Sequence, residues 1–174
     1  KIQLHIEDTP IDDVLLESYS MMIPMAESSN IQLEFDTEGC EHINVNADRT
    51  KLKQVVFNLI SNAIKYNKPG GRVKVNCEAR SEYRVRINVQ DTGPGIPQER
   101  QSELFKAFNR LGAESTDVEG TGIGLMISKK IIEMMGGELG FQSEEGKGSN
   151  FWLEMSTLDS LGKSDLNGII TVQS

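Results

Sequence analysis

Hydrophobic residues alternate with polar ones in several short segments, which is the pattern of strands with one buried face. The alternation is found in segments 2–6, 31–35, 73–77, 83–89, 139–141 and 151–155. Residues 68–71 contain a Pro and two Gly and break the preceding pattern, so we expect 73–77 and 83–89 to form a hairpin. A turn through 146–149 is expected to join the last two strands.

Two longer helices are predicted in the first half of the chain. Pro10 precedes a helix over about 11–29, in which Pro24 predicts a kink or an early end. Asp48 is a suitable N-cap for a second helix, whose hydrophobic residues recur at helical spacing through 52–63.

The second half of the chain has a weaker helix and a stronger one. A short helix is expected at 99–108, followed by a polar, glycine-containing stretch over 112–120 that we expect to form a mobile loop. Hydrophobic residues in 123–134 then predict a helix that ends at Gly136 and Gly137.

Hairpins mixed with helices, without regular strand-helix-strand alternation, predict an α+β fold. We expect a two-layer sandwich in which helices cover one face of a mixed, mostly antiparallel sheet. The residues after Met155 are polar and weakly patterned. The predicted organisation is therefore one domain over 1–157, followed by a polar tail or linker over 158–174.

Composition and charge narrow the class of protein. The chain has 174 residues, 37% of them hydrophobic, and a net charge of −8, which fits one folded domain and argues against broad nucleic-acid binding. An uninterrupted apolar run of the roughly 20 residues that cross a bilayer is missing, so we expect no membrane contact by this segment. The chain begins at Lys1 in a predicted strand, which suggests a segment of a longer polypeptide.

The two cysteines, Cys40 and Cys77, lie far apart in the sequence, and neither has a second Cys or a His at metal-ligand spacing. The sequence therefore signals neither a disulfide scaffold nor a zinc site. We expect a reducing, cytoplasmic location. A cytoplasmic part of a membrane-bound sensor is compatible with this expectation.

Asn58 and Asn62 are poor helix formers four residues apart inside the second predicted helix. With Gln54, Lys65 and Tyr66 they form a polar stripe along one side of that helix. Amide oxygens and an ammonium on one face suit a hard cation together with phosphate oxygens. A solvated helix face explains the same residues equally well.

Asp91-Thr92-Gly93-Pro94-Gly95 directly follows a predicted strand. A carboxylate at a strand end can accept a hydrogen bond from an exocyclic amine, while the glycines let a flat ring approach the backbone. The same residues also make an ordinary turn. An aspartic protease would require a second Asp loop, in this chain or in a partner chain.

Glycines at positions 120, 122 and 124 open the helix at 123–134, and bare amides at a helix start favour anions. The run lacks the strand before it and the acidic residue that complete a dinucleotide-binding motif. The sequence contains neither a Walker A motif nor the protein-kinase loop signatures.

The order of these features resembles the N, G1, F and G2 boxes of the GHKL superfamily, and in particular the catalytic ATP-binding domain of sensor histidine kinases. The four parts are the Asn58–Asn62 helix, the Asp91 turn, the Leu-Phe-Lys-Ala-Phe helix with Phe105 and Phe108, and the glycine-rich helix start. The resemblance covers about 2–155. It implies a Bergerat-type ATP-binding fold with ATP and Mg²⁺ as cofactors.

The resemblance also implies residue roles. Asn62 would hold Mg²⁺, and Asn58 would be a metal or phosphate ligand. Lys65 and Arg110 would act on the phosphates, so that Asn58, Lys65 and Arg110 would be the catalytic residues. A lid would span about 109–119. The residues implied to bind the nucleotide are Asn58, Asn62, Lys65, Tyr66, Asp91, Gly93, Gly95, Ile96, Phe108, Gly120, Thr121, Gly122, Gly124, Leu125 and Ser149.

Asn58 bears on the reaction that the resemblance implies. ATPases of the superfamily, such as gyrase and the large heat-shock chaperones, place a Glu at this position to activate water. An amide is no comparable base, so transfer to an external acceptor is favoured over fast hydrolysis. The alternatives are a nucleotide-binding pseudokinase or regulatory module, and a serine kinase of the anti-sigma type.

Partners follow from the same resemblance. The acceptor histidine of the family lies on a separate dimerisation domain, and neither His5 nor His42 matches it. We therefore expect as partners a histidine-bearing dimerisation domain of the same parent protein and a response regulator receiver domain. The isolated domain is expected to be a monomer and the parent protein a homodimer.

Overall fold

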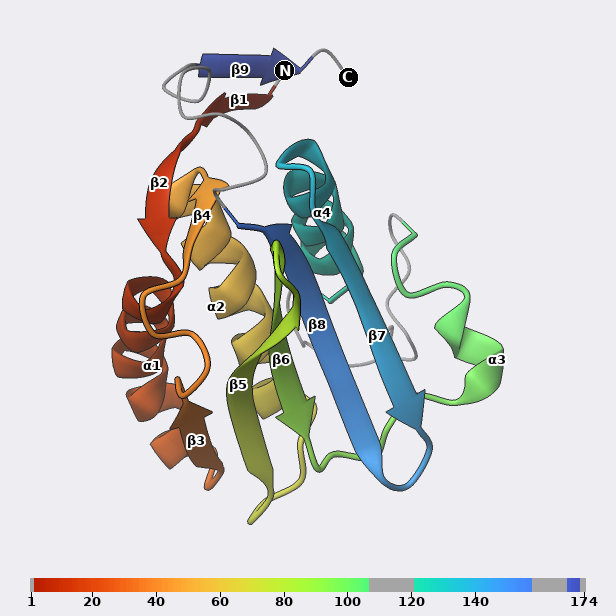
Figure 1. Ribbon diagram of the computed structural model, residues 1–174. Helices are drawn as coiled ribbons and strands as arrows, with labels where there is room; N and C mark the ends of the chain where they lie inside the picture. Colours follow the sequence, from red (N-terminus) through yellow and green to blue (C-terminus); the bar gives the residue numbers. More distant parts are fainter. Residues whose placement is uncertain (1, 107–120, 158–168, 173–174) are drawn as a thin grey trace.

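The computed structural model describes residues 2–106, 121–157 and 169–172 (Figure 1). The helices are α1 (Ile11–Ser28), α2 (Arg49–Lys65), α3 (Gln98–Gln101) and α4 (Thr121–Met134). The strands are β1 (Ile2–His5), β2 (Glu7–Pro10), β3 (Gln32–Asp36), β4 (Asn44–Ala47), β5 (Arg72–Ser81), β6 (Arg84–Asp91), β7 (Glu138–Glu144), β8 (Gly148–Ser156) and β9 (Ile169–Val172).

The main sheet has five strands in the order β3-β5-β6-β8-β7. Only the β3–β5 pair is parallel within this sheet, and the other three pairs are antiparallel. The predicted hairpin is β5–β6, and the turn through 146–149 joins β7 to β8. The predicted mixed, mostly antiparallel sheet is therefore confirmed.

Helices α1, α2 and α4 lie together on one face of this sheet (Figure 1). Strand alternation explains the arrangement, because Val85, Ile87 and Val89 of β6 point to the same face and are buried there. On α2, Leu52, Val56 and the other hydrophobic residues at helical spacing complete the core. The predicted two-layer sandwich is confirmed for the described part of the chain.

The other face of the sheet is polar. Glu154 of β8 is 8% exposed there and receives hydrogen bonds from Arg84 Nε and Arg86 Nε at 3.1 and 2.8 Å. Arg80 Nε lies 3.5 Å from the same carboxylate. The guanidinium of Arg86 also covers the ring of Trp152, at 3.9 Å from the ring centroid. A carboxylate and three arginines thus stabilise the face that the helices leave open.

One helix prediction is confirmed and one needs correction. Helix α1 confirms the predicted helix over about 11–29, since it continues past Pro24 to Ser28, and the early end given as an alternative to a kink does not occur. Helix α3 is limited to Gln98–Gln101, because residues 102–106 form turns instead of continuing the helix. The predicted helix at 99–108 is therefore too long. The predicted mobile loop at 112–120 lies outside the described residues.

The ends of the described chain lie side by side (Figure 1). Strand β1 pairs with β9 in a separate two-stranded antiparallel sheet, and β2 pairs with β4 in another. Segment 158–174, expected to be a polar tail or linker, therefore contains a strand at Ile169–Val172. The Ile-Ile-Thr-Val sequence of this strand is rich in residues that favour strands. Four residues are too short a segment for the pattern to predict it.

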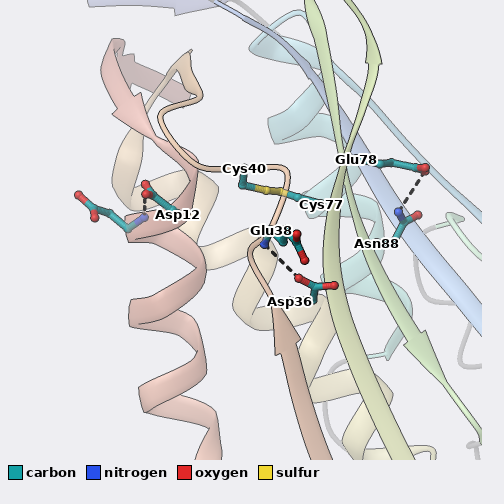
Figure 2. Close-up of a disulfide and its surroundings, with 8 residues drawn as sticks. Asp12, Asp36, Glu38, Cys40, Cys77, Glu78 and Asn88 are labelled. Atoms are coloured by element: carbon teal, nitrogen blue, oxygen red, sulfur yellow. Dashed lines mark hydrogen bonds between the residues drawn. A yellow bond between two sulfur atoms is a disulfide. The ribbon is translucent and has the colours of Figure 1, made fainter.

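The sequence signals no disulfide scaffold, but the structure pairs its two cysteines. Cys40, in the loop after β3, and Cys77, on β5, are joined by a disulfide, with their Cα atoms 5.7 Å apart (Figure 2). The parallel pairing of β3 with β5 brings together two residues that are 37 positions apart.

Among the described residues, α1 is the longest helix, and none of the helices has the length and apolar character needed to cross a bilayer.

Candidate functional site

A cavity of about 210 Å³ opens between the helix layer and one end of the sheet. Its walls come from α2, the turn after β6, α3, α4 and β8. The lining residues are Asn62, Ala63, Tyr66, Asp91, Pro94, Gly95, Ile96, Pro97, Arg100, Leu104, Leu125, Ser149 and Phe151. Most of this lining is apolar, and its polar groups are few, as in a site for a flat organic ring.

Helix α2 carries Asn62 to this cavity. The helix starts where the Asp48 carboxylate accepts a hydrogen bond from Lys51 N at 3.0 Å, which confirms the predicted N-cap. The Nδ2 atom of Asn62 is buried and has no hydrogen-bond partner among the described residues. An unpaired buried donor costs about 1–3 kcal/mol, so Asn62 is suited to a ligand that brings an acceptor such as a phosphate oxygen.

Asp91 ends β6 and lies in the cavity wall. Burial raises the pKa of Asp91, and hydrogen bonds from the backbone N–H groups of Gly93 and Ser149 act against this rise. The Gly93 bond measures 2.9 Å to Oδ1. The carboxylate is thus held in one orientation by main-chain donors, ready to accept a hydrogen bond from a ligand amine.

The turn after Asp91 requires glycine at two positions. A Cβ atom at Gly93 would lie 2.8 Å from the carbonyl oxygen of Tyr66, so the turn packs directly on the end of α2. Gly95 has a φ of +70°, and a Cβ there would overlap the carbonyl group of Glu144. Both glycines therefore let the turn lie close to neighbouring backbone.

Asn67 ties the end of α2 to this turn. Its Nδ2 donates to the carbonyl oxygen of Arg72 at 2.9 Å, and its Oδ1 accepts from Thr92 Oγ1 at 3.3 Å. Thr92 Oγ1 in turn accepts from Arg72 N at 2.8 Å. The network fixes the spacing between the residues that follow Asn62 and those that follow Asp91.

Asn58 lies one turn before Asn62 and contacts α4 instead of lining the cavity. Its Nδ2 donates to Ser128 Oγ at 3.1 Å. A Cβ atom at Gly124 would lie 2.9 Å from Asn58 Oδ1, so α4 passes directly over the amide. The structure thus brings the predicted Asn helix and the glycine-rich helix start into contact.

The structure places the predicted site residues differently. Those that line the cavity are Asn62, Tyr66, Asp91, Gly95, Ile96, Leu125 and Ser149. Gly93 packs against the lining residues Tyr66 and Asp91, and Asn58 and Gly124 contact each other between α2 and α4. Lys65 is exposed at the end of α2 and is not part of the cavity wall as described. Phe108, Arg110 and Gly120 lie outside the described residues, and Thr121 and Gly122 are described only as the start of α4.

Sequence reasoning missed six lining residues, which are Ala63, Pro94, Pro97, Arg100, Leu104 and Phe151. Four of these neighbour a residue named in the sequence analysis, namely Ala63, Pro94, Pro97 and Leu104. Phe151 had a usable signal, because it alternates inward on β8 next to Ser149. No sequence signal pointed to Arg100, the exposed cation of the lining, because it is one of several charged residues in the predicted short helix at 99–108.

Burial also raises the pKa of Tyr66, a cavity residue that is 36% exposed overall. The phenol therefore stays neutral well above pH 7, and its ring can stack or pack against a ligand in the cavity. Phe105, predicted as part of the third box, packs on Phe141 of β7 at 5.8 Å between ring centroids and against the hydrophobic core.

The arrangement fits an adenine nucleotide by its chemistry. The apolar walls match the two faces of a purine, and Asp91 matches its exocyclic amine. The unpaired Nδ2 of Asn62 is a donor that needs an acceptor from the ligand. The described residues contain no group of three or more His, Cys, Asp or Glu that would hold a metal alone. Amide oxygens with phosphates and water are a donor set that Mg²⁺ accepts.

Comparison with known proteins defines the family. Residues 47–158 match the model of the family described as histidine kinase-, DNA gyrase B- and HSP90-like ATPase. The chain belongs to this family, and within it to the ATP-binding catalytic domains of two-component sensor histidine kinases.

Particular relatives support this placement. The chain is 34% identical over 159 residues to the sensor protein GacS of Pseudomonas syringae pv. syringae, covering 88% of this chain and 18% of that protein. It is 35% identical over 151 residues to the signal transduction histidine-protein kinase BarA of Escherichia coli K12, covering 84% of this chain and 16% of BarA. The chain thus spans less than a fifth of these relatives.

Solved structures agree. The catalytic domain of histidine kinase ThkA, in a nucleotide-free form, superposes with a TM-score of 0.76 at 32% identity, covering 88% of this chain and 96% of that one. Full-length ShkA in complex with AMPPNP gives a TM-score of 0.77 at 29% identity, covering 90% of this chain and 32% of that one. The predicted Bergerat-type fold is therefore confirmed.

Proposed function

We propose that this domain binds Mg-ATP and transfers the γ-phosphoryl group to a histidine on a dimerisation domain outside this chain. The observation that supports the proposal best is Asp91, a carboxylate held by main-chain donors in an otherwise apolar cavity. A group with this environment selects an amine in the plane of a flat ring. Adenine has that amine, whereas guanine has a carbonyl oxygen at the corresponding place.

Asn62 and Asn58 would hold Mg²⁺ with the phosphate oxygens. Bound there, the ion would offset the negative charge that develops on the transferred phosphoryl group. Lys65, exposed at the end of α2, and Arg110, outside the described residues, would add positive charge near the phosphates. Thr121 and Gly122, at the start of α4, would offer main-chain amides, as would Gly120, which lies outside the described residues.

The side chains of the site support transfer rather than hydrolysis. Asp91 is the only carboxylate in the described cavity lining, and it is engaged by Gly93 N–H. Asn58 is an amide that donates to Ser128 and is no general base. The acceptor imidazole would therefore supply the nucleophilic nitrogen, forming the N–P bond as the bond from the γ-phosphorus to the β–γ bridging oxygen breaks and ADP leaves.

The partners of the proposed reaction are the histidine-bearing dimerisation domain and, after it, a response regulator receiver domain. A solved complex of histidine kinase ThkA with the response regulator TrrA contains a chain that superposes on this one with a TM-score of 0.71 at 29% identity. We propose the same class of partner here. We also propose that the domain works in the cytoplasm, as a monomer when isolated and within a homodimer in its parent protein.

The test is transfer in trans to the dimerisation domain of the parent protein. With radiolabelled ATP and Mg²⁺, the label should appear on the dimerisation domain and be lost in acid but kept in alkali, as phosphohistidine requires. Asp91→Ala should abolish labelling at low ATP, while Gln90→Ala, on the same strand but the opposite face, should not. Acid-stable label would indicate a serine kinase instead, and binding without any transfer would indicate a pseudokinase.

A further inference from the structure

Ser128 is a buried hydroxyl in the middle of α4. It is 3% exposed, and the inward-facing residues around it on the same helix, such as Leu125 and Ile132, are hydrophobic. Alanine would be the better helix former there and would bury no polar group. The hydroxyl therefore serves a purpose other than helix formation or core packing.

The partner of this hydroxyl is the side chain of Asn58. The Nδ2 of Asn58 donates to Ser128 Oγ at 3.1 Å across 70 residues of sequence. One helical turn before Ser128, the absence of a side chain at Gly124 leaves room for the same amide, since a Cβ there would lie 2.9 Å from Oδ1 and 3.1 Å from Nδ2. Gly124 and Ser128 thus form a notch in α4 that receives Asn58.

The hydrogen bond holds the Asn58 amide in place against α4. Because Nδ2 is engaged by Ser128, the oxygen is the atom of this amide left to bind a hard cation. Without the bond, the side chain would rotate more freely. The position of Asn58 is therefore set by a residue that is not part of the cavity lining.

We propose that Ser128 is a positioning residue that orients Asn58 for the magnesium-bridged phosphates. The inference rests on the proposed function, because it takes Asn58 as a metal or phosphate ligand. A cation on Oδ1 draws electron density from the amide and makes its N–H a stronger donor, so the metal contact and the Ser128 bond reinforce each other. Outer partners of this kind typically change metal affinity by about 10–100-fold when removed.

The test measures ATP binding by calorimetry, once with Mg²⁺ and once with EDTA, on the intact domain. Ser128→Ala should weaken binding about tenfold with Mg²⁺ and less than about twofold with EDTA. Ser128→Thr, which keeps the hydroxyl, should restore most of the magnesium-dependent affinity. Ser18→Ala is the matched control, because Ser18 is equally buried in α1 but bonds to the main-chain oxygen of Val14 at 2.8 Å.

A second comparison separates positioning from packing. In an Asn58→Ala background, Ser128→Ala should cause no further loss of affinity, since the amide that it orients is gone. Equal weakening with Mg²⁺ and EDTA, no weakening in either, or a full Ser128 effect without Asn58 would overturn the proposal. A wild-type domain that releases no heat with ATP would instead overturn the proposed function on which it rests.

Discussion

Glu154 offers the sharpest test of how the open face of the sheet is stabilised. Replacing it by Gln keeps the shape of the side chain but removes the charge that faces Arg80, Arg84 and Arg86. The carboxylate is only 8% exposed and accepts from Arg84 Nε at 3.1 Å and Arg86 Nε at 2.8 Å. Both hydrogen bonds end on a charged carboxylate in the wild type. In the variant, the two arginines can donate at most to a neutral amide oxygen.

The expected loss follows from those two bonds. Hydrogen bonds to charged groups contribute about 1.5–3 kcal/mol and neutral ones about 0.5–1.5, so the variant should lose roughly 2–3 kcal/mol of unfolding free energy. For a domain of this size that lowers Tm by roughly 5–10 °C. ATP affinity should not change, because Glu154 lies on the face opposite the helices and the cavity.

The pH dependence adds an independent check. Burial acts to raise the pKa of Glu154, but the bonds from Arg84 and Arg86 outweigh it and lower that pKa below its ordinary 4.5. A lowered pKa in the folded state means that the carboxylate stabilises the fold above about pH 4.5 and loses this contribution as pH falls through the folded value. The Tm difference between wild type and Glu154→Gln should therefore shrink in acid.

Thermal unfolding followed by circular dichroism measures these differences. Glu138→Gln is the control, because the Glu138 carboxylate is 66% exposed and lies 3.9 Å from Arg84. It should shift the unfolding free energy by less than about 0.5 kcal/mol. If Glu154→Gln shifts Tm no more than this control, or shifts it equally at pH 7 and pH 3, the reasoning is refuted.

Two further changes test other features. Gly95→Ala should unfold at lower temperature and bind ATP less tightly, because a methyl there overlaps the Glu144 backbone; Gly70→Ala, with a φ of +79° but open space around it, should cost only about 1 kcal/mol, and equal losses would contradict the argument. Breaking the Cys40–Cys77 disulfide should lower stability by about 4 kcal/mol for a 37-residue separation, seen as a Tm loss on adding reductant. If two thiols react in the protein unfolded without reductant, the two cysteines are not joined by a disulfide.

The sheet and its helices were predictable because their signals are local. Alternation in 83–89 gave both the strand and the face that it buries, and Asp48 marked the start of α2. Element lengths were less predictable, because Pro24 left open whether α1 ends early, and the helix continues to Ser28. In that helix, packing of residues such as Met22 and Ala26 against the core outweighs the lost hydrogen bond.

The site was predictable only in part. Asn62 and Asp91 stood out because their residue types are unusual for their places in a helix and at a strand end. The contact between Asn58 and Ser128 was not predictable, since it joins two helices 70 residues apart through ordinary residue types. The same holds for the Cys40–Cys77 pair and for the pairing of β1 with β9, which depend on tertiary structure alone.

The most direct measurement is a calorimetric titration of the domain with ATP and Mg²⁺. The account predicts binding at one site, and a loss of roughly 10–150-fold in affinity for Asp91→Ala, which is about 1.5–3 kcal/mol for a hydrogen bond to a charged acceptor. Gln90→Ala should bind like the wild type, and GTP should bind more weakly than ATP. No heat with ATP, or equal affinity in Asp91→Ala and the wild type, would contradict the account.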